Sequence, residues 1–316
     1  MSLDLLDKKI LYYLDLNSRS TAKQIAKLVR AKKETVHFRI NRLKESGYIK
    51  NFLTTIHTSQ LNKYYYKIFY KFHNLNPQSY KQIITHIKTD SKTAWFGEFE
   101  GPYDLAFLII AESIYDLEEF TNKFKAKFGK HILEQEIHVL TSVHRFNLKF
   151  FYQGKGQLHT KYPKQLTKSK IDNKDLQIIS LLSNNARISL LDIAKKVNLD
   201  SSTVNYRIKK LKKQKVIGTH TLAVDFNKFQ VQHYQINFKL INPRVSEKII
   251  AYFSQIKNAT FATTTIGKYD LAVEFVAKDN RELRGLIDQA KEKFQSQIQS
   301  HDTFLIVKEH NVTWLP

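Results

Sequence analysis

The sequence predicts an α+β protein in which one unit occurs twice, each copy made of a three-helix segment followed by a βαββαβ segment. Three observations predict this architecture. The chain contains an internal repeat, the spacing of its apolar residues changes from helical to alternating within each copy, and its positive charge is concentrated in three segments. The 316 residues suffice for several small domains, and the 42% hydrophobic share is typical of a globular chain with real cores.

The internal repeat becomes visible when the sequence is shifted against itself by 168 positions. Residues 4–49 then align without a gap with residues 172–217, and the identities include two aspartates, an Asn-x-Arg triplet and the triplet Ile-Ala-Lys. Further along the shift becomes 166, where Gly101-Pro-Tyr-Asp-Leu-Ala meets Gly267-Lys-Tyr-Asp-Leu-Ala. We therefore expect a duplication of roughly 150 residues.

The first segment of each copy has the spacing of three short helices and a wing. Apolar residues recur at helical spacing from residue 6 to residue 14, and again in the second copy. Thr21 and Gln24 form an N-terminal capping pair for a second helix, which we expect to bury Ile25, Ala26 and Leu28. After the third helix, apolar pairs at 48–49 and 216–217 begin strands that could form the wing of a winged helix-turn-helix.

The second segment of each copy reads as a ferredoxin-like βαββαβ domain. In the first copy the pattern predicts strands at 64–72, 93–99, 103–111 and 136–143 and helices at 79–87 and 115–128, and it recurs from 233 to 310. The expected divisions are winged helix-turn-helix domains at 1–56 and 171–225, ferredoxin-like domains at 60–152 and 230–316, and a basic connector at 153–170.

Net charge is distributed very unevenly along the chain. The total is +22, of which residues 1–50 contribute +7, residues 145–170 contribute +7 and residues 171–218 contribute +6. The βαββαβ segments are close to neutral. Local basic segments between neutral ones indicate sites that meet a polyanion, so we expect double-stranded DNA as the partner.

Several protein classes are excluded or disfavoured by composition. The chain has no cysteine, which excludes disulfides, zinc-cysteine sites and thiol catalysis. The first ten residues lack the apolar run of a signal peptide, and no stretch is long and apolar enough for a membrane helix, so we expect a cytoplasmic protein. His131, His138 and His144 lack the spacing of a metal site, and we expect no metal and no cofactor.

The third helix of each copy carries the side chains that the sequence assigns to nucleic acid. Val36, Ile40 and Leu43 lie on one face, so the residues between them turn outward. Asn, Ser and Thr can hydrogen-bond base edges, while Lys and Arg serve phosphates or guanine; the alternative is a solvated face that contacts nothing. The expected DNA-binding residues are Lys32, Lys33, Thr35, His37, Phe38, Arg39, Asn41, Arg42, Ser201, Ser202, Thr203, Asn205, Tyr206, Arg207, Lys209 and Lys210.

The two third helices differ where they begin. Asp200 and Ser201 are good N-caps in the second copy, whereas the first has Lys32 and Lys33, which cannot cap and oppose the helix dipole. A bound phosphate or a different helix start would have to compensate. Because the outward faces also differ, we expect the copies to read unequal half-sites of an asymmetric operator.

Together these motifs resemble the leucine-responsive/asparagine-operon (Lrp/AsnC) family of transcription regulators. The resemblance is carried by the Asn-x-Arg turn, Ile-Ala-Lys, T-V-x-x-R-I-x-x-L at 35–43 and 203–211, and G-x-Y-D-L at 101–105 and 267–271. It implies a winged helix-turn-helix followed by the family's ferredoxin-like regulatory (RAM) domain, present here as a tandem repeat. It also implies dimerisation through the sheets, here as an intramolecular pseudo-dimer with its sheets face to face, and potentially a higher homo-oligomer.

The same resemblance implies an effector site for an amino acid or similar small molecule beside the G-x-Y-D turns. The residues carried over are Gly101, Tyr103, Asp104, Gly267, Tyr269 and Asp270. The alternative is a tight turn in which the aspartate binds nearby backbone amides.

Two other functions share part of the pattern. A nucleoid-associated architectural protein would have the same basic features. Siroheme decarboxylases share the fold, but they carry an arginine- and aromatic-rich segment where this chain has Gly-Pro-Tyr-Asp-Leu and Gly-Lys-Tyr-Asp-Leu. No phosphate loop, serine elbow or paired-acid motif is present, so we expect a regulator and not an enzyme.

Overall fold

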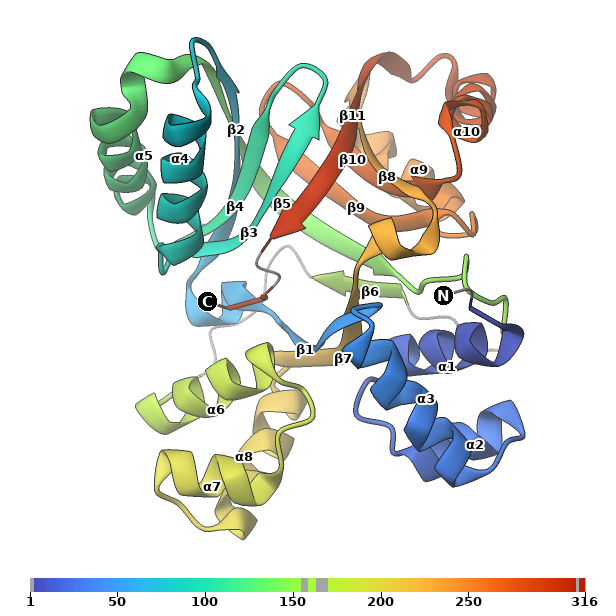
Figure 1. Ribbon diagram of the computed structural model, residues 1–316. Helices are drawn as coiled ribbons and strands as arrows, with labels where there is room; N and C mark the ends of the chain where they lie inside the picture. Colours follow the sequence, from blue (N-terminus) through green and yellow to red (C-terminus); the bar gives the residue numbers. More distant parts are fainter. Residues whose placement is uncertain (1–2, 155–158, 163–169, 311–312, 316) are drawn as a thin grey trace.

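Two three-helix heads lie on one side of a β-barrel that both copies build together (Figure 1). The computed structural model describes residues 3–154, 159–162, 170–310 and 313–315. Most of the basic connector expected at 153–170 lies outside these residues. None of the helices in the described ranges is long and apolar enough to span a bilayer.

Each head contains three helices whose starts follow from local sequence. They are α1 (Leu5–Leu16), α2 (Ala22–Val29) and α3 (Lys33–Glu45) in the first head, and α6 (Asn173–Asn184), α7 (Leu190–Val197) and α8 (Ser201–Lys213) in the second. The repeated aspartates explain the first helix of each, because Asp4 with Asp7, and Asp172 with Asp175, form capping boxes.

The second helix of the first head confirms one expectation and corrects another. The predicted capping pair Thr21 and Gln24 forms a complete capping box. Leu28, however, is 53% exposed, and Val29 packs in the core with Ile25 in its place. Val29 lies one helical turn after Ile25 and so shares its inward face.

A two-stranded ribbon joins the heads to each other and to the barrel. Its strands, β1 (Ile49–Ile56) and β7 (Ile217–Val224), are the expected wing strands, and they pair antiparallel with each other across the two copies. The turn after helix 1 of each head also binds the strand of the other copy, because Ser18 N donates to His220 O and Ala186 N donates to Phe52 O. Each wing is therefore completed by the opposite copy.

The repeated Asn-x-Arg triplets lock the heads together. Arg19 donates to the carbonyl of Ala186, and Arg187 donates to the carbonyls of Ser18 and Ser20. The Arg187 guanidinium also lies 4.1 Å from the ring centroid of Phe52. This reciprocal exchange fixes one head against the other.

The barrel domains have the predicted βαββαβ order. The first contains β2 (Tyr64–Phe72), α4 (Pro77–Thr89), β3 (Thr93–Glu100), β4 (Leu105–Ala111), α5 (Ile114–Phe128) and β5 (Ile132–Phe146). The second contains β8 (Gln232–Leu240), α9 (Ser246–Phe253), β9 (Ala259–Ile266), β10 (Leu271–Ala277), α10 (Asn280–Phe294) and β11 (Ile298–His310), and short β6 (His159–Tyr162) pairs with the end of β5. β4 starts two residues later than expected because Tyr103 and Asp104 form the preceding turn.

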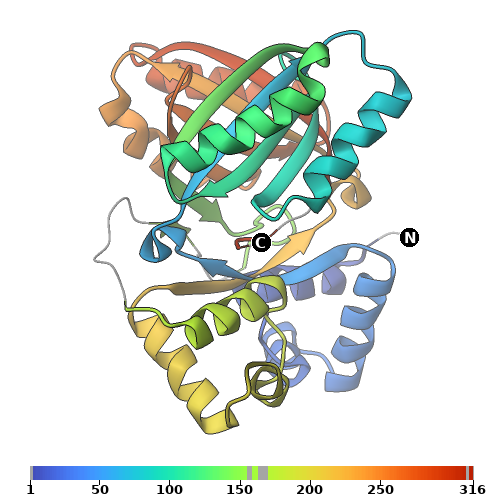
Figure 2. The same ribbon diagram turned by 90° about the vertical axis from the view of Figure 1, so that its left-hand side faces the viewer.

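The two sheets join at both edges instead of stacking as separate layers. Within the domains the strand orders are β5-β2-β4-β3 and β11-β8-β10-β9, and the pairs β3–β11 and β5–β9 close the ring. The expected packing was face to face. Edge pairing differs from it because it hydrogen-bonds the backbone groups of the edge strands, which face-to-face stacking alone would leave unpaired. Helices α4 and α5 cover one side of the barrel and α9 and α10 the other (Figures 1 and 2).

A buried ion pair ties the first head to the barrel. Arg145, at the end of β5, binds Asp15 of α1, and their side chains are 3% and 0% exposed. The other carboxylate oxygen of Asp15 accepts from Leu148 N at 2.9 Å, and Leu148 packs in the core of the head. The head is thus held by a charge pair that is almost fully shielded from water.

We expect Arg145→Met to lower the free energy of unfolding by about 3–5 kcal/mol, because it leaves the carboxylate of Asp15 buried without its cation. Urea unfolding followed by circular dichroism measures this. The matched control is Lys123→Met, which breaks the solvent-exposed pair with Glu119 and should leave the urea midpoint nearly unchanged. A loss below about 1 kcal/mol for Arg145→Met would contradict the role given to the buried pair.

Candidate nucleic-acid interface and ligand pocket

The third helices, α3 and α8, present the expected DNA-binding residues on the heads, on the side of the ribbon opposite the barrel (Figures 1 and 2). Both helices bury the predicted apolar face. The exposed members of the expected set are Lys32, Lys33, Thr35, His37, Phe38, Asn41, Ser202, Tyr206 and Lys209. The half-buried members are Arg39, Arg42, Ser201, Thr203, Asn205, Arg207 and Lys210.

An aromatic side chain stands at the same place in each third helix. Phe38 is 65% exposed and Tyr206 is 69% exposed, which is unusual for side chains of this size. Neither packs in a core of its head, so both are free to contact a partner surface. Around them the polar neighbours differ, with Asn41 on α3 and Lys209 on α8.

Several of the expected basic residues are already paired inside the heads. Arg39 binds Asp4 at 2.6 Å and Asp7 at 3.0 Å, and Arg42 binds both oxygens of Asp7. Their contacts with Asp7 join α3 to α1, and the Asp7 side chain is only 1% exposed. These arginines therefore hold the third helix in place, where the sequence had suggested phosphate or base contacts.

The second head repeats this arrangement. Arg207 binds Asp172 at 2.7 Å and Asp175 at 2.8 Å, and Lys210 lies 3.8 Å from Asp175. The Asp-x-x-Asp pair thus has two roles in each copy, as capping box and as anchor for the third helix. The sequence already indicated the second role, because the aspartates and the arginines recur together at the same shift of 168 positions.

The helix starts differ as expected. The Asp200 carboxylate caps α8 by accepting from the amide of Thr203, and its hydrogen bonds with the hydroxyls of Ser202 and Thr203 hold its pKa well below its usual value. In α3 the N-cap is Lys32, with no side-chain hydrogen bond to the helix amides. The first recognition helix therefore begins with free amide donors and two ammonium groups, and the second begins with a carboxylate.

The G-x-Y-D turns are held by their aspartates. Asp104 accepts from the amide of Phe72 at 2.7 Å, and Asp270 accepts from the amide of Leu240 at 2.8 Å. Gly101 has φ of +134° and lies against β11, where a Cβ would meet the carbonyl of Thr303 at 3.1 Å. These contacts match the tight-turn interpretation of the motif.

The tyrosines of the turns point away from solvent. Tyr103 donates to Glu136 and Tyr269 donates to Asp302, and both rings contact Phe304 inside the barrel. The structure thus brings Tyr103 and Tyr269 together in one aromatic cluster, although they come from different copies.

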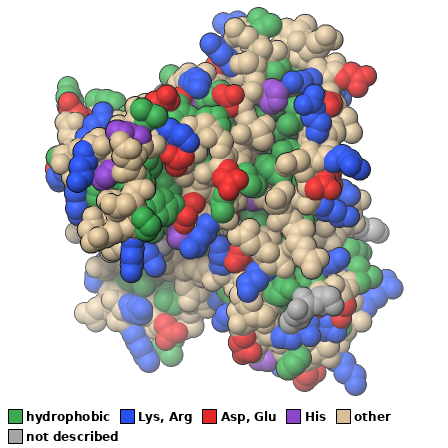
Figure 3. Space-filling view, turned by 45° about the horizontal axis from the view of Figure 1, so that its top comes forward, with side chains coloured by type: hydrophobic (Ala, Val, Ile, Leu, Met, Phe, Trp, Pro, Cys, Tyr) green, Lys and Arg blue, Asp and Glu red, His purple; other side chains and the backbone are tan. Residues whose placement is uncertain are grey.

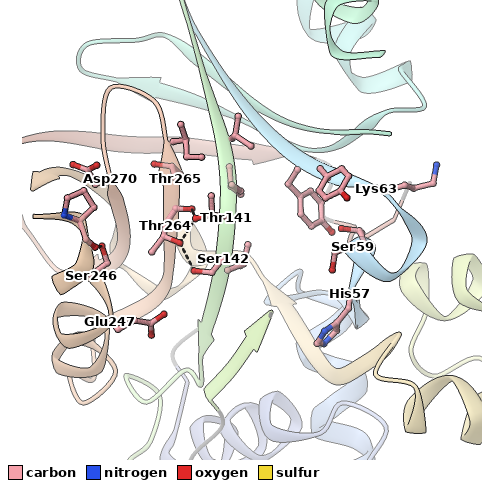
Figure 4. A pocket seen from close by; sticks show the side chains of 18 of the residues that line it. His57, Ser59, Lys63, Thr141, Ser142, Ser246, Glu247, Thr264, Thr265 and Asp270 are labelled. Atoms are coloured by element: carbon pink, nitrogen blue, oxygen red, sulfur yellow. Dashed lines mark hydrogen bonds between the residues drawn. The ribbon is translucent and has the colours of Figure 1, made fainter. Parts of the chain in front are cut away.

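A pocket of about 600 Å³ opens on one side of the barrel (Figure 4). It lies between the 3-10 turn η1 (Thr58–Leu61), strands β5 and β9, and the start of α9, and Asp270 is the one turn residue of the expected effector set among its lining side chains. Ser, Thr and Tyr side chains are frequent in its wall, and Thr264 hydrogen-bonds both Thr141 and Ser142. Charged side chains of both signs surround them: Lys63, Arg244, Glu247 and Asp270.

The related place in the other half is filled by larger side chains. At the shift of 166, Ser246 and Thr264 correspond to Tyr80 and Glu98. The Tyr80 hydroxyl donates to Glu98 at 2.6 Å, and His310 lies 2.7 Å from the other carboxylate oxygen. The duplicated fold therefore has two different sides, one with a hydroxyl-lined pocket and one closed by a hydrogen-bonded trio.

The barrel surface carries charges of both signs. Seen with the barrel end brought forward, acidic and basic side chains are interspersed over it (Figure 3). Within the described ranges, no three His, Asp or Glu side chains converge as a metal site would require.

Comparisons with known proteins agree with the geometry of the heads. The model of the winged helix-turn-helix DNA-binding family matches residues 3–50 and 171–217. An uncharacterised HTH-type transcriptional regulator of Pyrococcus abyssi is 30% identical over 131 residues, which cover 40% of this chain and 86% of that protein. The HTH-type transcriptional regulator LysM of Sulfurisphaera tokodaii is 32% identical over 103 residues, covering 32% of this chain and 71% of LysM.

A solved structure shares the fold over nearly the whole chain. The siroheme decarboxylase NirDL superposes with a TM-score of 0.65 at 14% identity, over 97% of this chain and 92% of NirDL. AsnC of E. coli aligns with 44% of this chain and 94% of its own, at 21% identity and a TM-score of 0.39.

The regulators that match this chain have the length of one copy, and both copies carry the helix-turn-helix. The chain belongs to the Lrp/AsnC family of helix-turn-helix transcription regulators, with the unit of that family duplicated in tandem.

Proposed function

We propose that the protein is a sequence-specific DNA-binding regulator in which one chain reads two unequal half-sites of one duplex. The observation that carries this proposal is the pair of exposed third helices, which present different side chains in heads locked together by Arg19 and Arg187. Because both heads belong to one chain, DNA binding needs no second chain. The covalent link sets the effective concentration of one head near the other, so that DNA binding does not depend on dimerisation.

Base contacts come from the centre of each third helix. On α3, Asn41 can pair with an adenine edge and Phe38 can contact a thymine methyl group. On α8, Lys209 favours guanine or phosphate beside Tyr206. These different contacts support the reading of different sequences by the two heads.

Phosphate contacts are strongest at the start of α3. Free amide donors at a helix N-terminus attract phosphate, and Lys32 and Lys33 add two exposed ammonium groups there. A bound phosphate would replace the missing cap. We therefore assign the start of α3 to the DNA backbone and not to bases.

The alternative of a nucleoid-associated architectural protein shares these contacts. It predicts occupancy spread over the genome, whereas a local regulator predicts discrete sites, and genome-wide occupancy distinguishes the two. We propose further that the chain is not an enzyme, although its fold is shared with a siroheme decarboxylase. Absorbance titration with an iron tetrapyrrole tests this, and stoichiometric binding followed by decarboxylation would refute it.

We propose that a small effector, an amino acid or a similar molecule, binds in the hydroxyl-lined pocket of Figure 4. A volume of about 600 Å³ is in the usual range for small-molecule sites. Arg244 offers positive charge for a carboxylate, and Glu247 and Asp270 offer negative charge for an ammonium group. Lys63 is already paired with Glu112 at 2.7 Å. The pocket adjoins η1, the link between the first head and the barrel, so that an occupant could change the position of that head.

Replacing Lys32 and Lys33 by alanine should weaken binding to all DNA sequences alike, because these residues contact phosphates. The slope of log affinity against log salt should become shallower by about 1 for each lost contact. Fluorescence anisotropy between 50 and 200 mM salt measures both effects. Lys123→Ala, on the exposed face of α5, is the matched control and should change neither. An unaltered salt slope in the double variant would contradict the assignment.

DNA selected from a random library should contain a non-palindromic site, because the two heads differ. Giving α3 the outward residues of α8, by the substitutions His37→Asn, Phe38→Tyr and Asn41→Lys, should shift the selected site toward a palindrome. The wild-type chain selected in parallel is the control. Sedimentation should give one chain per duplex. A palindromic wild-type site, or binding only as a higher assembly, would refute the proposal.

Calorimetry against amino acids should detect one binding site per chain. The double variant Ser246→Tyr and Thr264→Glu copies the closed side of the barrel and should abolish the heat. The matched control, Tyr80→Ser with Glu98→Thr, changes the opposite side and should keep it. Heat that persists in the closed variant, or no heat with any amino acid, would overturn this site.

A further inference from the structure

A second cavity lies inside the barrel and has a different character from the pocket of Figure 4. This barrel cavity measures about 120 Å³ and is bounded by the inner faces of strands from both copies. Tyr65, Leu140 and Val143 line both spaces, so the two are neighbours. The walls of the barrel cavity are largely aromatic and aliphatic, and they include Trp95, Phe261 and Trp314.

One wall of the barrel cavity carries buried charges. Lys67 lies 3.8 Å from Glu274, and His233 lies 3.3 Å from Glu274 and 3.5 Å from Glu309. Burial alone would lower the pKa of His233, but the carboxylates of Glu309 and Glu274 raise it to about 9. Burial lowers the pKa of Lys67, and the carboxylates of Glu274 and Glu309 act against that shift. With Lys67 and His233 both protonated, the two positive charges balance the two carboxylates of the wall.

The internal balance of charge limits what the cavity can hold. A charged occupant would add an unpaired charge to a buried site, which is costly. A neutral occupant with a hydrogen-bond donor has acceptors available, since Trp95 Nε1 donates to one oxygen of Glu309 and carboxylate oxygens accept more than one bond. The charged wall thus favours a neutral donor.

The size of the cavity indicates a single ring. An engineered protein cavity of about 150 Å³ lined by apolar side chains binds benzene. The barrel cavity is slightly smaller and is walled by aromatic rings, against which another ring packs well. A phenol-sized molecule satisfies both the volume and the donor.

The last described residues close the cavity and reach the second head. Trp314 lines the cavity, and its carbonyl accepts from the hydroxyl of Tyr65 at 2.6 Å. The next residue, Leu315, donates from its amide to Ser183 Oγ of α6 and is buried in the core of the second head. A displacement of Trp314 would therefore move Leu315 and alter the packing of that head.

We propose that the barrel cavity binds a neutral, single-ring aromatic molecule with one hydrogen-bond donor, and that its occupancy is transmitted to the second head through Trp314 and Leu315. The binding step is independent of the proposed function, whereas the effect on DNA rests on it.

Phenol is the probe for the binding step. The chain has two tryptophans, Trp95 and Trp314, and both line the cavity, so tryptophan emission excited near 295 nm reports directly on it. Phenol should change this emission and give one site per chain by calorimetry. Toluene, which lacks the donor, should bind about tenfold or more weakly.

Filling the cavity tests its location. Leu108→Phe on β4 and Thr263→Leu on β9 enter it from two different walls, and each should abolish phenol binding. Leu133→Phe, at an exposed position, is the matched control. Circular dichroism verifies folding. Two filling sites are used so that the location can still be tested if one variant fails to fold. No saturable binding, or phenol binding unchanged in both filled variants, would overturn the site.

Transmission is tested on DNA with the full chain. Phenol should reduce protection of the half-site bound by the second head and leave the other half-site unchanged, and Leu315→Ala should keep phenol binding but lose this effect. Equal protection with and without bound phenol would refute the transmission. Failure of the chain to bind any DNA would refute the proposed function instead. Calorimetry and tryptophan emission would still test phenol binding in the barrel cavity.

Discussion

The structure depends on one constraint, which is that each copy must supply backbone and side-chain partners to the other. Within the described ranges the ribbon strand of each copy pairs with that of the other copy, and the turns after α1 and α6 donate to the opposite strand. Buried amides and carbonyls without these partners would be costly. Arg19 and Arg187 add the same exchange through side chains. The relative position of the heads is therefore built into the fold.

Duplication within one chain also removes a restriction that a homodimer has. In a homodimer every substitution occurs on both sides, whereas here the two sides have diverged. The same place holds a closed trio around Tyr80 in one half and a hydroxyl-lined pocket around Ser246 in the other. Lys67 and Gln235 occupy matching positions in the barrel, yet one is a cation near Glu274 and the other is a neutral amide. Scaffold residues keep the repeat, and residues that line the pocket depart from it.

The sequence was enough to predict the helices, the order of the strands and the capping pairs, because these depend on local spacing. Strand β2, for example, has the predicted bounds. It was not enough for the cross-copy pairing of β1 with β7, which depends on tertiary contacts and not on a local signal. The ion pair of Arg39 with Asp4 is also a tertiary outcome, whereas the inward position of Val29 follows from its helical spacing to Ile25. The DNA-contacting residues remain predictions.

Net charge overstates the positive potential available to DNA. Arg39, Arg42 and Arg207 neutralise aspartates at the starts of α1 and α6, and the pairs with Asp7 and Asp175 are shielded from water. What remains free differs between the heads, since α3 begins with lysines and α8 with a carboxylate. In the proposed complex with DNA, repulsion between that carboxylate and phosphate would leave the second head more dependent on base contacts. The two heads would then divide phosphate anchoring and base discrimination between them, which a symmetric dimer could not do.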